Sequence, residues 1–259
     1  MLPRARTAAA RRASPVTYND RTLAVVSDIH GNLVALEAVI ADLERRGVSR
    51  VLQGGDLALG GRQPAEVIDL VRELGWPGVV GNTDEVLWRP EALAEQMERA
   101  PKLASLLRTL FDEEGPATRE LLGEERLAWL AELPGEYEDG NLALVHAAPG
   151  NLWRAPMPDD RDADLLKAYA ELDAPLVVYG HIHRPYVRDL GSMTVANSGS
   201  VGSPYDGDPR ASYLLVGEKP EVVRVEYDVE REVAGLLASG YPGADRIAES
   251  RRSGSYVRV

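Results

Sequence analysis

Residues 23–32 read LAVVSDIHGN, a short apolar run that ends in an aspartate, a histidine and a glycine. The run Leu23–Val26 is short and ends in two valines, which predicts a buried strand. Apolar residues then recur at helical spacing from Leu33 to Leu43, and Gly47 closes the predicted helix. The stretch therefore predicts a strand, a polar turn and a helix in immediate succession.

The same order of elements is repeated further along the chain. A second predicted strand, 51–53, runs into Gly54-Gly55-Asp56 and is followed by a helix over about 64–74. A third, 78–80, runs into Gly81-Asn82. Alternating strands and helices indicate an α/β fold with parallel strand pairs.

The composition of the chain changes after residue 87. Residues 88–135 are rich in Ala, Leu, Glu and Arg and predict two or three helices, broken near 115–116 and Gly123, that form a helical cap. Strands 142–145 and 176–179 follow, and then the short runs 193–196, 212–216 and 222–227, which we interpret as antiparallel, before a last helix near Asp228. We expect one domain over 21–259.

Composition limits the classes of function. The 259 residues carry a net charge of −12, which disfavours a long nucleic acid as partner but not a small phosphorylated molecule. The absence of cysteine excludes disulfides and thiolate sites, and no apolar run is long enough for a membrane span. Residues 1–20 are basic and predict a disordered extension, an over-long gene start or a transit peptide. We expect a cytoplasmic monomer or small homo-oligomer.

Five predicted strands end in polar side chains that can bind metal. The carboxyl ends of strands in an open α/β sheet lie along one edge, so these groups should converge. All four histidines of the chain belong to the set. Oxygen and nitrogen donors suit two cations, most simply Mn²⁺, with Fe, Zn²⁺ or Ni²⁺ as alternatives. The predicted ligands are Asp28, His30, Asp56, Asn82, His146, His181 and His183.

The order of these blocks resembles the calcineurin-like metallophosphoesterases, and in particular their compact bacterial and archaeal phosphodiesterase-like branch. The blocks are Asp28-Ile29-His30, Gly55-Asp56, Gly81-Asn82, His146 and Gly180-His181-Ile182-His183. The resemblance implies a four-layer αββα sandwich of two mixed sheets flanked by helices. It also implies one metal on Asp28, His30, Asp56 and His183, and a second on Asp56, Asn82, His146 and His181.

The resemblance implies a dinuclear centre that activates a hydroxide to hydrolyse phosphodiesters or nucleotide phosphoanhydrides, including dinucleoside polyphosphates. We expect Asp56, Asn82 and His146 to act in catalysis as well as in metal binding. Many relatives carry a leaving-group histidine after the Gly-Asn pair, but this chain has Thr83, followed by Asp84 as a candidate proton donor. The alternatives are a phosphomonoesterase, a Ser/Thr protein phosphatase, or a protein-binding scaffold without catalysis.

Substrate contacts are predicted less directly. Asn32 either contacts the phosphate or caps the helix that begins at Leu33. Arg184 and Arg210 either bind phosphate oxygens or are solvated surface charges. Three of the four tryptophans, at 88, 129 and 153, either line a base-stacking pocket under the cap or pack in the core.

Overall fold

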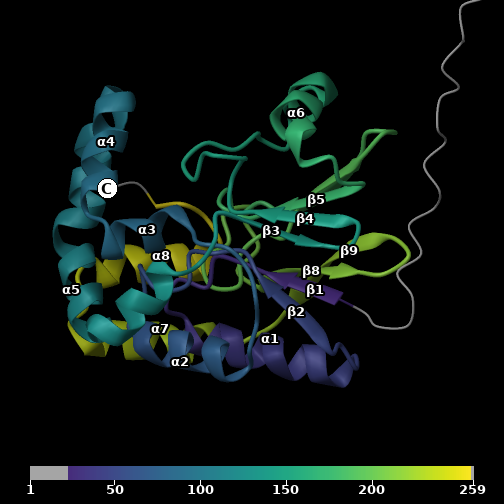
Figure 1. Ribbon diagram of the computed structural model, residues 1–259. Helices are drawn as coiled ribbons and strands as arrows, with labels where there is room; N and C mark the ends of the chain where they lie inside the picture. Colours follow the sequence, from purple (N-terminus) through teal and green to yellow (C-terminus); the bar gives the residue numbers. More distant parts are fainter. Residues whose placement is uncertain (1–22, 258–259) are drawn as a thin grey trace, which may run out of the picture.

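The computed structural model describes residues 23–257, which form two mixed β-sheets flanked by helices (Figure 1). The first sheet has the strand order β2-β1-β8-β9, and the second has the order β3-β4-β5-β7-β6. The strands of the first sheet are β1 Leu23–Val26, β2 Arg50–Gln53, β8 Ala211–Val216 and β9 Pro220–Val225. Those of the second are β3 Glu136–Asp139, β4 Leu142–Val145, β5 Leu176–Tyr179, β6 Tyr186–Asp189 and β7 Thr194–Asn197.

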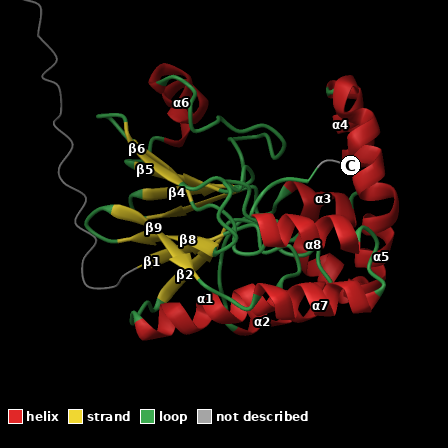
Figure 2. Ribbon diagram, turned by 180° about the vertical axis from the view of Figure 1, so that it is seen from behind, coloured by secondary structure: helices red, strands yellow, loops and turns green. Residues whose placement is uncertain are grey.

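Alternation of side chains along the strands builds the layers. Leu23 and Val25 of β1 face the second sheet and join a core with residues of β4, β5 and β8. Ala24 and Val26 point the other way, onto the helices α1 Leu33–Arg45 and α2 Pro64–Glu73. The helix α6 Asp162–Tyr169 covers the outer face of the second sheet (Figure 2). The order helix, sheet, sheet, helix is the predicted four-layer sandwich.

The remaining helices gather at one edge of the two sheets (Figures 1 and 2). They are α3 Asn82–Trp88, α4 Glu91–Arg99, α5 Ala104–Ala131, α7 Val229–Ser239 and α8 Ala244–Ser253. The carboxyl ends of β1 and β2 point toward this group of helices, so side chains that follow those strands lie between sheet and helices. No helix of residues 23–257 has both the length and the apolar character that a membrane span requires.

Several details differ from the sequence prediction. β3 and β6 were not predicted, because their sequences, EYED and YVRD, belong to half-exposed edge strands. Residues 78–80 form only an isolated bridge to Gln53, and β7 pairs in parallel with β5 as well as antiparallel with β6. The helix α5 continues through the predicted break at 115–116 and kinks only at Gly123. The predicted extension 1–20 lies outside the described residues.

Candidate metal centre and substrate cavity

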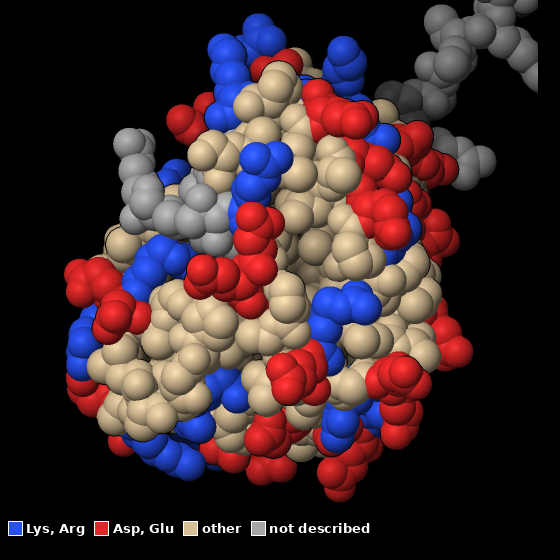
Figure 3. Space-filling model, turned by 90° about the vertical axis from the view of Figure 1, so that its left-hand side faces the viewer, with Lys and Arg blue, Asp and Glu red and all other residues tan. Residues whose placement is uncertain are grey.

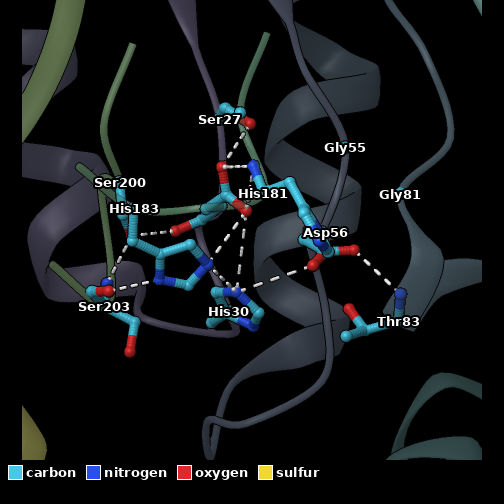
Figure 4. A network of polar contacts seen from close by, with 12 residues as sticks. Ser27, His30, Gly55, Asp56, Gly81, Thr83, His181, His183, Ser200 and Ser203 are labelled. Carbon is cyan, nitrogen blue, oxygen red and sulfur yellow. Dashed lines mark hydrogen bonds and ion pairs between the residues drawn. The ribbon is translucent and has the colours of Figure 1, made fainter. Parts of the chain in front are cut away.

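The polar groups that follow β1, β2, β4 and β5 converge between the sheets and the helices. Figure 4 shows His30, Asp56, His181 and His183 of this set. Two groups of side chains have ligand atoms that all lie within 4.8 Å of one another. The first group is Asp28, His30, Asp56 and His183, and the second is Asp56, His146 and His181. Asp56 belongs to both, which is the arrangement of a bridging carboxylate between two cations.

Distances within the first group fit a shared cation. Asp28 Oδ1 lies 3.0 Å from His183 Nε2 and 3.9 Å from His30 Nε2. Asp56 Oδ2 lies 3.8 Å from His30 Nε2, on the side that faces the second group. Ligand atoms bound to one cation at about 2.0–2.2 Å are separated by distances of this order.

The second group includes the amide of Asn82. Its Oδ1 lies 2.9 Å from His146 Nε2 and 3.0 Å from His181 Nδ1. His146 Nε2 is also 3.5 Å from Asp56 Oδ2. The structure therefore brings together all seven predicted metal ligands.

Backbone carbonyls orient the imidazole rings. Nδ1 of His30 lies 2.6 Å from the Leu59 carbonyl oxygen, and Nδ1 of His146 lies 2.8 Å from that of Gly54. Nδ1 of His183 bonds the Ser203 carbonyl in the same way. A carbonyl only accepts, so each Nδ1 carries the proton and each Nε2 presents a lone pair to the cluster. His181 is reversed: Nε2 faces the Trp153 carbonyl at 3.2 Å, and Nδ1 faces the cluster.

These lone pairs crowd one another in a way that requires a positive charge. Nε2 of His30 and Nε2 of His183 are 3.2 Å apart, although both Nδ1 atoms already hold the ring protons. Burial, reinforced by the neighbouring His183, lowers the pKa of His30 to about 4. Burial and His146 lower the pKa of His181 to about 4 as well. Both rings are therefore neutral at neutral pH and free to bind a cation.

The carboxylate of Asp28 remains ionised within this cluster. Burial alone would raise its pKa, but the imidazoles of His183, His146 and His30 hold it well below the usual range. Its Oδ2 accepts hydrogen bonds from Ser27 Oγ at 2.6 Å and from the His181 backbone N–H at 3.0 Å. Asp28 is thus a fixed negative charge at the centre of the cluster.

The backbone of the site is strained at the predicted ligands themselves. Six non-glycine residues among 23–257 have positive φ angles, and five of them are ligands of this cluster. Such a conformation costs of the order of 1–3 kcal/mol at a non-glycine residue and is concentrated at functional sites. The five are Asp28, His30, Asp56, His181 and His183.

The glycines that precede ligands act mainly by their small size. Gly55 does have a positive φ of 85°. Gly81 instead has an extended backbone, and a Cβ there would overlap the backbone nitrogen and the carboxylate of Asp56. A Cβ at Gly180 would overlap Ser27 and Asp28. These positions therefore let neighbouring strand ends approach one another closely.

Asp84, the candidate proton donor, faces away from the cluster. It is fully buried, and its carboxylate accepts hydrogen bonds from the backbone N–H groups of Leu57 at 3.0 Å and Gly81 at 3.3 Å. Burial and the nearby Asp56 raise its pKa to about 7. It does not line the cavity, whereas Thr83 does. The geometry favours a positioning role for Asp84 behind the Asp56 loop.

A cavity of about 420 Å³ opens over the cluster. One part of its wall consists of cluster residues, including His30, Asp56, Asn82 and His181. Helices of the predicted cap supply Gln96 of α4 and three residues of α5, and α8 supplies three more. The residues from the helices α5 and α8 are Leu107, Phe111, Glu114, Arg246, Ile247 and Ser250. Helices that stand outside the sandwich therefore form one side of the cavity.

The predicted substrate contacts lie elsewhere. Asn32 is fully buried and caps α1 by accepting from the Ala35 N–H at 3.0 Å, while its amide nitrogen donates to the Gly202 carbonyl. Arg210 is bound to Asp208 through Nε and Nη2, and Arg184 is exposed. None of Asn32, Arg184 and Arg210 is among the residues that line the cavity.

Of the tryptophans, only Trp153 lines the cavity. Its ring lies 6.1 Å from that of Phe111, while Trp88 and Trp129 pack against the core. Tyr205, which the sequence analysis missed, stacks on His183 with ring centroids 4.2 Å apart and planes at 15°. No sequence pattern marked Tyr205, because it lies in a loop 22 positions from the histidine that it contacts.

Comparison with known proteins identifies the family. A model of the calcineurin-like phosphoesterase superfamily domain matches residues 22–219, which include every residue of the metal cluster. The chain belongs to the calcineurin-like phosphoesterase superfamily. Its fold, its Asp and His cluster and the match agree on a hydrolase of the phosphoesterase type.

Relatives of this calcineurin-like phosphoesterase come from archaea and bacteria. An uncharacterized protein of Methanocaldococcus jannaschii is 31% identical over 244 residues, which span 85% of this chain and 93% of that protein. The crystal structure of a metallophosphoesterase from Sphaerobacter thermophilus is 27% identical, with a TM-score of 0.74 over 91% of this chain and 100% of that one. A hypothetical protein from Pyrococcus horikoshii OT3 shares the fold at 19% identity, with a TM-score of 0.77 over 92% of this chain and 100% of that one.

Proposed function

We propose that this calcineurin-like phosphoesterase uses two divalent cations, Mn²⁺ in the first place, to hydrolyse phosphodiesters or nucleotide phosphoanhydrides of the dinucleoside polyphosphate type. The single observation that carries the proposal is the convergence of bare imidazole lone pairs and carboxylates at one buried point. The Nε2 atoms of His30 and His183 lie 3.2 Å apart on rings whose Nδ1 atoms donate to carbonyl oxygens, and two lone pairs at this distance are stabilised by a cation between them.

The donor set fits such a pair of cations. It contains only imidazole nitrogens, carboxylate oxygens and one amide oxygen, which suit borderline and hard metals. When bound, the cations supply Lewis acidity and lower the pKa of water, so that no covalent nucleophile is required. The chain itself fixes the positions of the ligands through three imidazole–carbonyl hydrogen bonds and through the strained loops that carry them.

The surroundings of Asn82 bear on the choice of substrate. The neighbouring cavity wall carries Thr83, whose hydroxyl is too weak an acid to protonate a leaving group, and Asp84 is turned toward backbone amides. Substrates whose leaving groups are stable as anions need little protonation. Aryl esters and phosphoanhydrides belong to this class, whereas simple alkyl monoesters do not.

The surface also bears on the size of the substrate. On the face that carries α4 and α5, acidic and basic side chains of the described residues are interspersed and form no extended basic patch (Figure 3). A long polyanion would gain little from such a surface. The cavity of about 420 Å³ instead suits a small molecule.

The proposal is tested by hydrolysis of bis(para-nitrophenyl) phosphate with added Mn²⁺. Asp56→Asn and His146→Gln remove cluster ligands and should lower kcat more than a hundredfold, since even indirect supports of a metal are worth about 10–100-fold. Asp159→Asn, an exposed carboxylate, is the matched control and should retain wild-type turnover. Faster turnover of para-nitrophenyl phosphate than of the diester would contradict the proposed substrate class, and no turnover of either would contradict the function.

A further inference from the structure

An ion pair that the metal cluster does not use lines the same cavity. Arg246 in the first turn of α8 donates from Nη2 to Oε1 of Glu114 in α5. The two side chains are 20% and 7% exposed, respectively, and both belong to the cavity wall. The pair therefore places a held cationic group inside the space that a substrate would occupy.

The position of Glu114 determines how the guanidinium is held. Gly243, just before α8, lies so close that a Cβ there would be 2.9 Å from Glu114 Oε1 and 3.4 Å from Arg246 Nη2. Glu114 contacts one of the two terminal nitrogens of the guanidinium. Among residues 23–257, Nε and Nη1 of Arg246 have no hydrogen-bond partner. Glu114 thus orients the Arg246 guanidinium and leaves its Nε and Nη1 N–H groups to donate to a second acceptor.

Apart from Ser250 of α8 and Gln96 of α4, the helical wall around this pair is apolar. Leu107, Phe111 and Ile247 come from the same two helices, and Trp153 adds a further ring. An apolar wall with one fixed arginine is the combination expected for a ligand that carries both a ring and a negative charge. The charge would be additional to the phosphoryl group, because that group has its own cations in the proposed function.

We propose that Arg246 binds a second anionic group on the non-scissile part of the substrate, beside a ring that packs on the apolar wall. The inference rests on the proposed function and narrows its substrate class to ring-bearing phosphoesters or phosphoanhydrides with a further negative charge. Glu114 is a positioning residue for Arg246. A carboxylate and a phosphate offer the same bidentate acceptor geometry, so the test includes both.

The test compares three diesters that differ in one ring substituent. Bis(para-nitrophenyl) phosphate carries no second charge, and its analogues replace one nitro group by a carboxylate or by a phosphonate. In each, water adds to phosphorus, the aryl oxygen–phosphorus bond breaks and para-nitrophenolate leaves, so the measured step is the same.

For wild type we expect kcat/KM to be higher for at least one charged analogue than for the uncharged diester. Arg246→Gln should lower the ratio of kcat/KM for that charged analogue to kcat/KM for the uncharged diester about tenfold or more. The change should lie in KM of the charged analogue, because a hydrogen bond to a charged group is being removed. Arg246→Lys keeps the charge but loses the paired guanidinium donors, so its ratio should lie between those of wild type and Arg246→Gln. Arg252→Gln, on the same helix and paired with Glu230 at the surface, is the control and should keep the wild-type ratio.

Calorimetric titration separates this inference from the proposed function. Para-carboxyphenylphosphonate should bind wild type more tightly than phenylphosphonate does, and Arg246→Gln should abolish the difference. An equal loss of kcat/KM for all three diesters in Arg246→Gln, with no calorimetric difference in wild type, would show that the pair only joins α5 to α8. Absence of turnover in wild type would contradict the proposed function, while the calorimetric comparison would still decide the role of Arg246. Should Arg246→Gln fail to fold, Arg246→Lys serves in both measurements.

Discussion

Gly81→Ala is the substitution whose effect follows most directly from the geometry of the site. The backbone of Gly81 has φ −95° and ψ 169°, which alanine adopts without strain, so any effect must come from the added methyl group. That carbon would lie 2.8 Å from Asp56 Cγ and even closer to the Asp56 backbone nitrogen. Asp56, the carboxylate shared by both halves of the cluster, would have to move.

The expected magnitude has two parts. Overpacking of a tight site costs about 1–3 kcal/mol, which for a chain of this size lowers Tm by about 2–12 °C. A displacement of the bridging carboxylate of about 1 Å should lower kcat about a hundredfold. The assays are differential scanning fluorimetry, calorimetric titration with Mn²⁺, and hydrolysis of bis(para-nitrophenyl) phosphate.

Gly217→Ala is the matched control for this experiment. Gly217 follows β8, its φ lies outside the left-handed region, a Cβ there would meet nothing within 4 Å, and alanine should leave Tm, Mn²⁺ affinity and turnover unchanged. A Gly81→Ala protein with wild-type Mn²⁺ affinity and turnover would refute the reasoning, because it would mean that Asp56 need not stay where the structure places it.

Four further predictions concern groups around the site and one distant network. Asp84→Asn should slow aryl and alkyl esters by the same factor if Asp84 only positions Asp56, whereas a larger loss for alkyl esters would identify it as a proton donor. Tyr205→Phe should retain Mn²⁺ affinity and Tyr205→Ala should weaken it, as measured by calorimetry, because the ring stacked on His183 is the part that matters. Asp42 accepts a 2.7 Å hydrogen bond from the buried Tyr213 hydroxyl. Burial alone would raise the pKa of Asp42, but the bonds from Tyr213 and from Arg46, the residue that follows α1, keep it lowered. The Asp42 carboxylate therefore stabilises the folded state above its unfolded-state pKa of about 4, and this stabilisation is lost as pH falls through the lower folded-state pKa. Asp42→Asn should lower the free energy of unfolding by about 1–3 kcal/mol at neutral pH and by progressively less below about pH 4, as measured by chemical denaturation. Removal of metal by a chelator should lower Tm, since a cation at a hundred times its Kd stabilises by about 2.7 kcal/mol, and an unchanged melting curve would count against metal binding.

Local patterns along the chain predicted the strand–helix alternation and the metal cluster, whereas the two-sheet sandwich followed from the resemblance to the calcineurin-like metallophosphoesterases. Short apolar runs such as Leu23–Val26 are buried on both faces, so they contain no polar residues, and the ligands follow them directly. The edge strands β3 and β6 escaped prediction because alternate residues face solvent and are charged. Local composition does not distinguish such strands from loops.

The substrate cavity was predicted much less well, and the reason is physical. Its wall depends on how α5 and α8 pack over the cluster, and α8 has the hydrophilic sequence ADRIAESRRS, without an evident apolar stripe. Arg246 consequently went unnoticed, while Arg184 and Arg210, chosen because a guanidinium can bind phosphate oxygens, lie outside the cavity lining. The positive φ angles at five ligands were also invisible, because aspartate and histidine carry no sequence mark of strain.

The central claim is that side chains from Asp28 to His183 hold two cations that share Asp56. Diffraction from crystals grown with Mn²⁺, recorded at wavelengths on either side of the manganese absorption edge, tests it most directly. The account predicts two anomalous peaks about 3.5–4 Å apart, one beside His30 and His183 and the other beside Asn82 and His146. Peaks elsewhere, or a cluster that stays without anomalous density at saturating Mn²⁺, would contradict it.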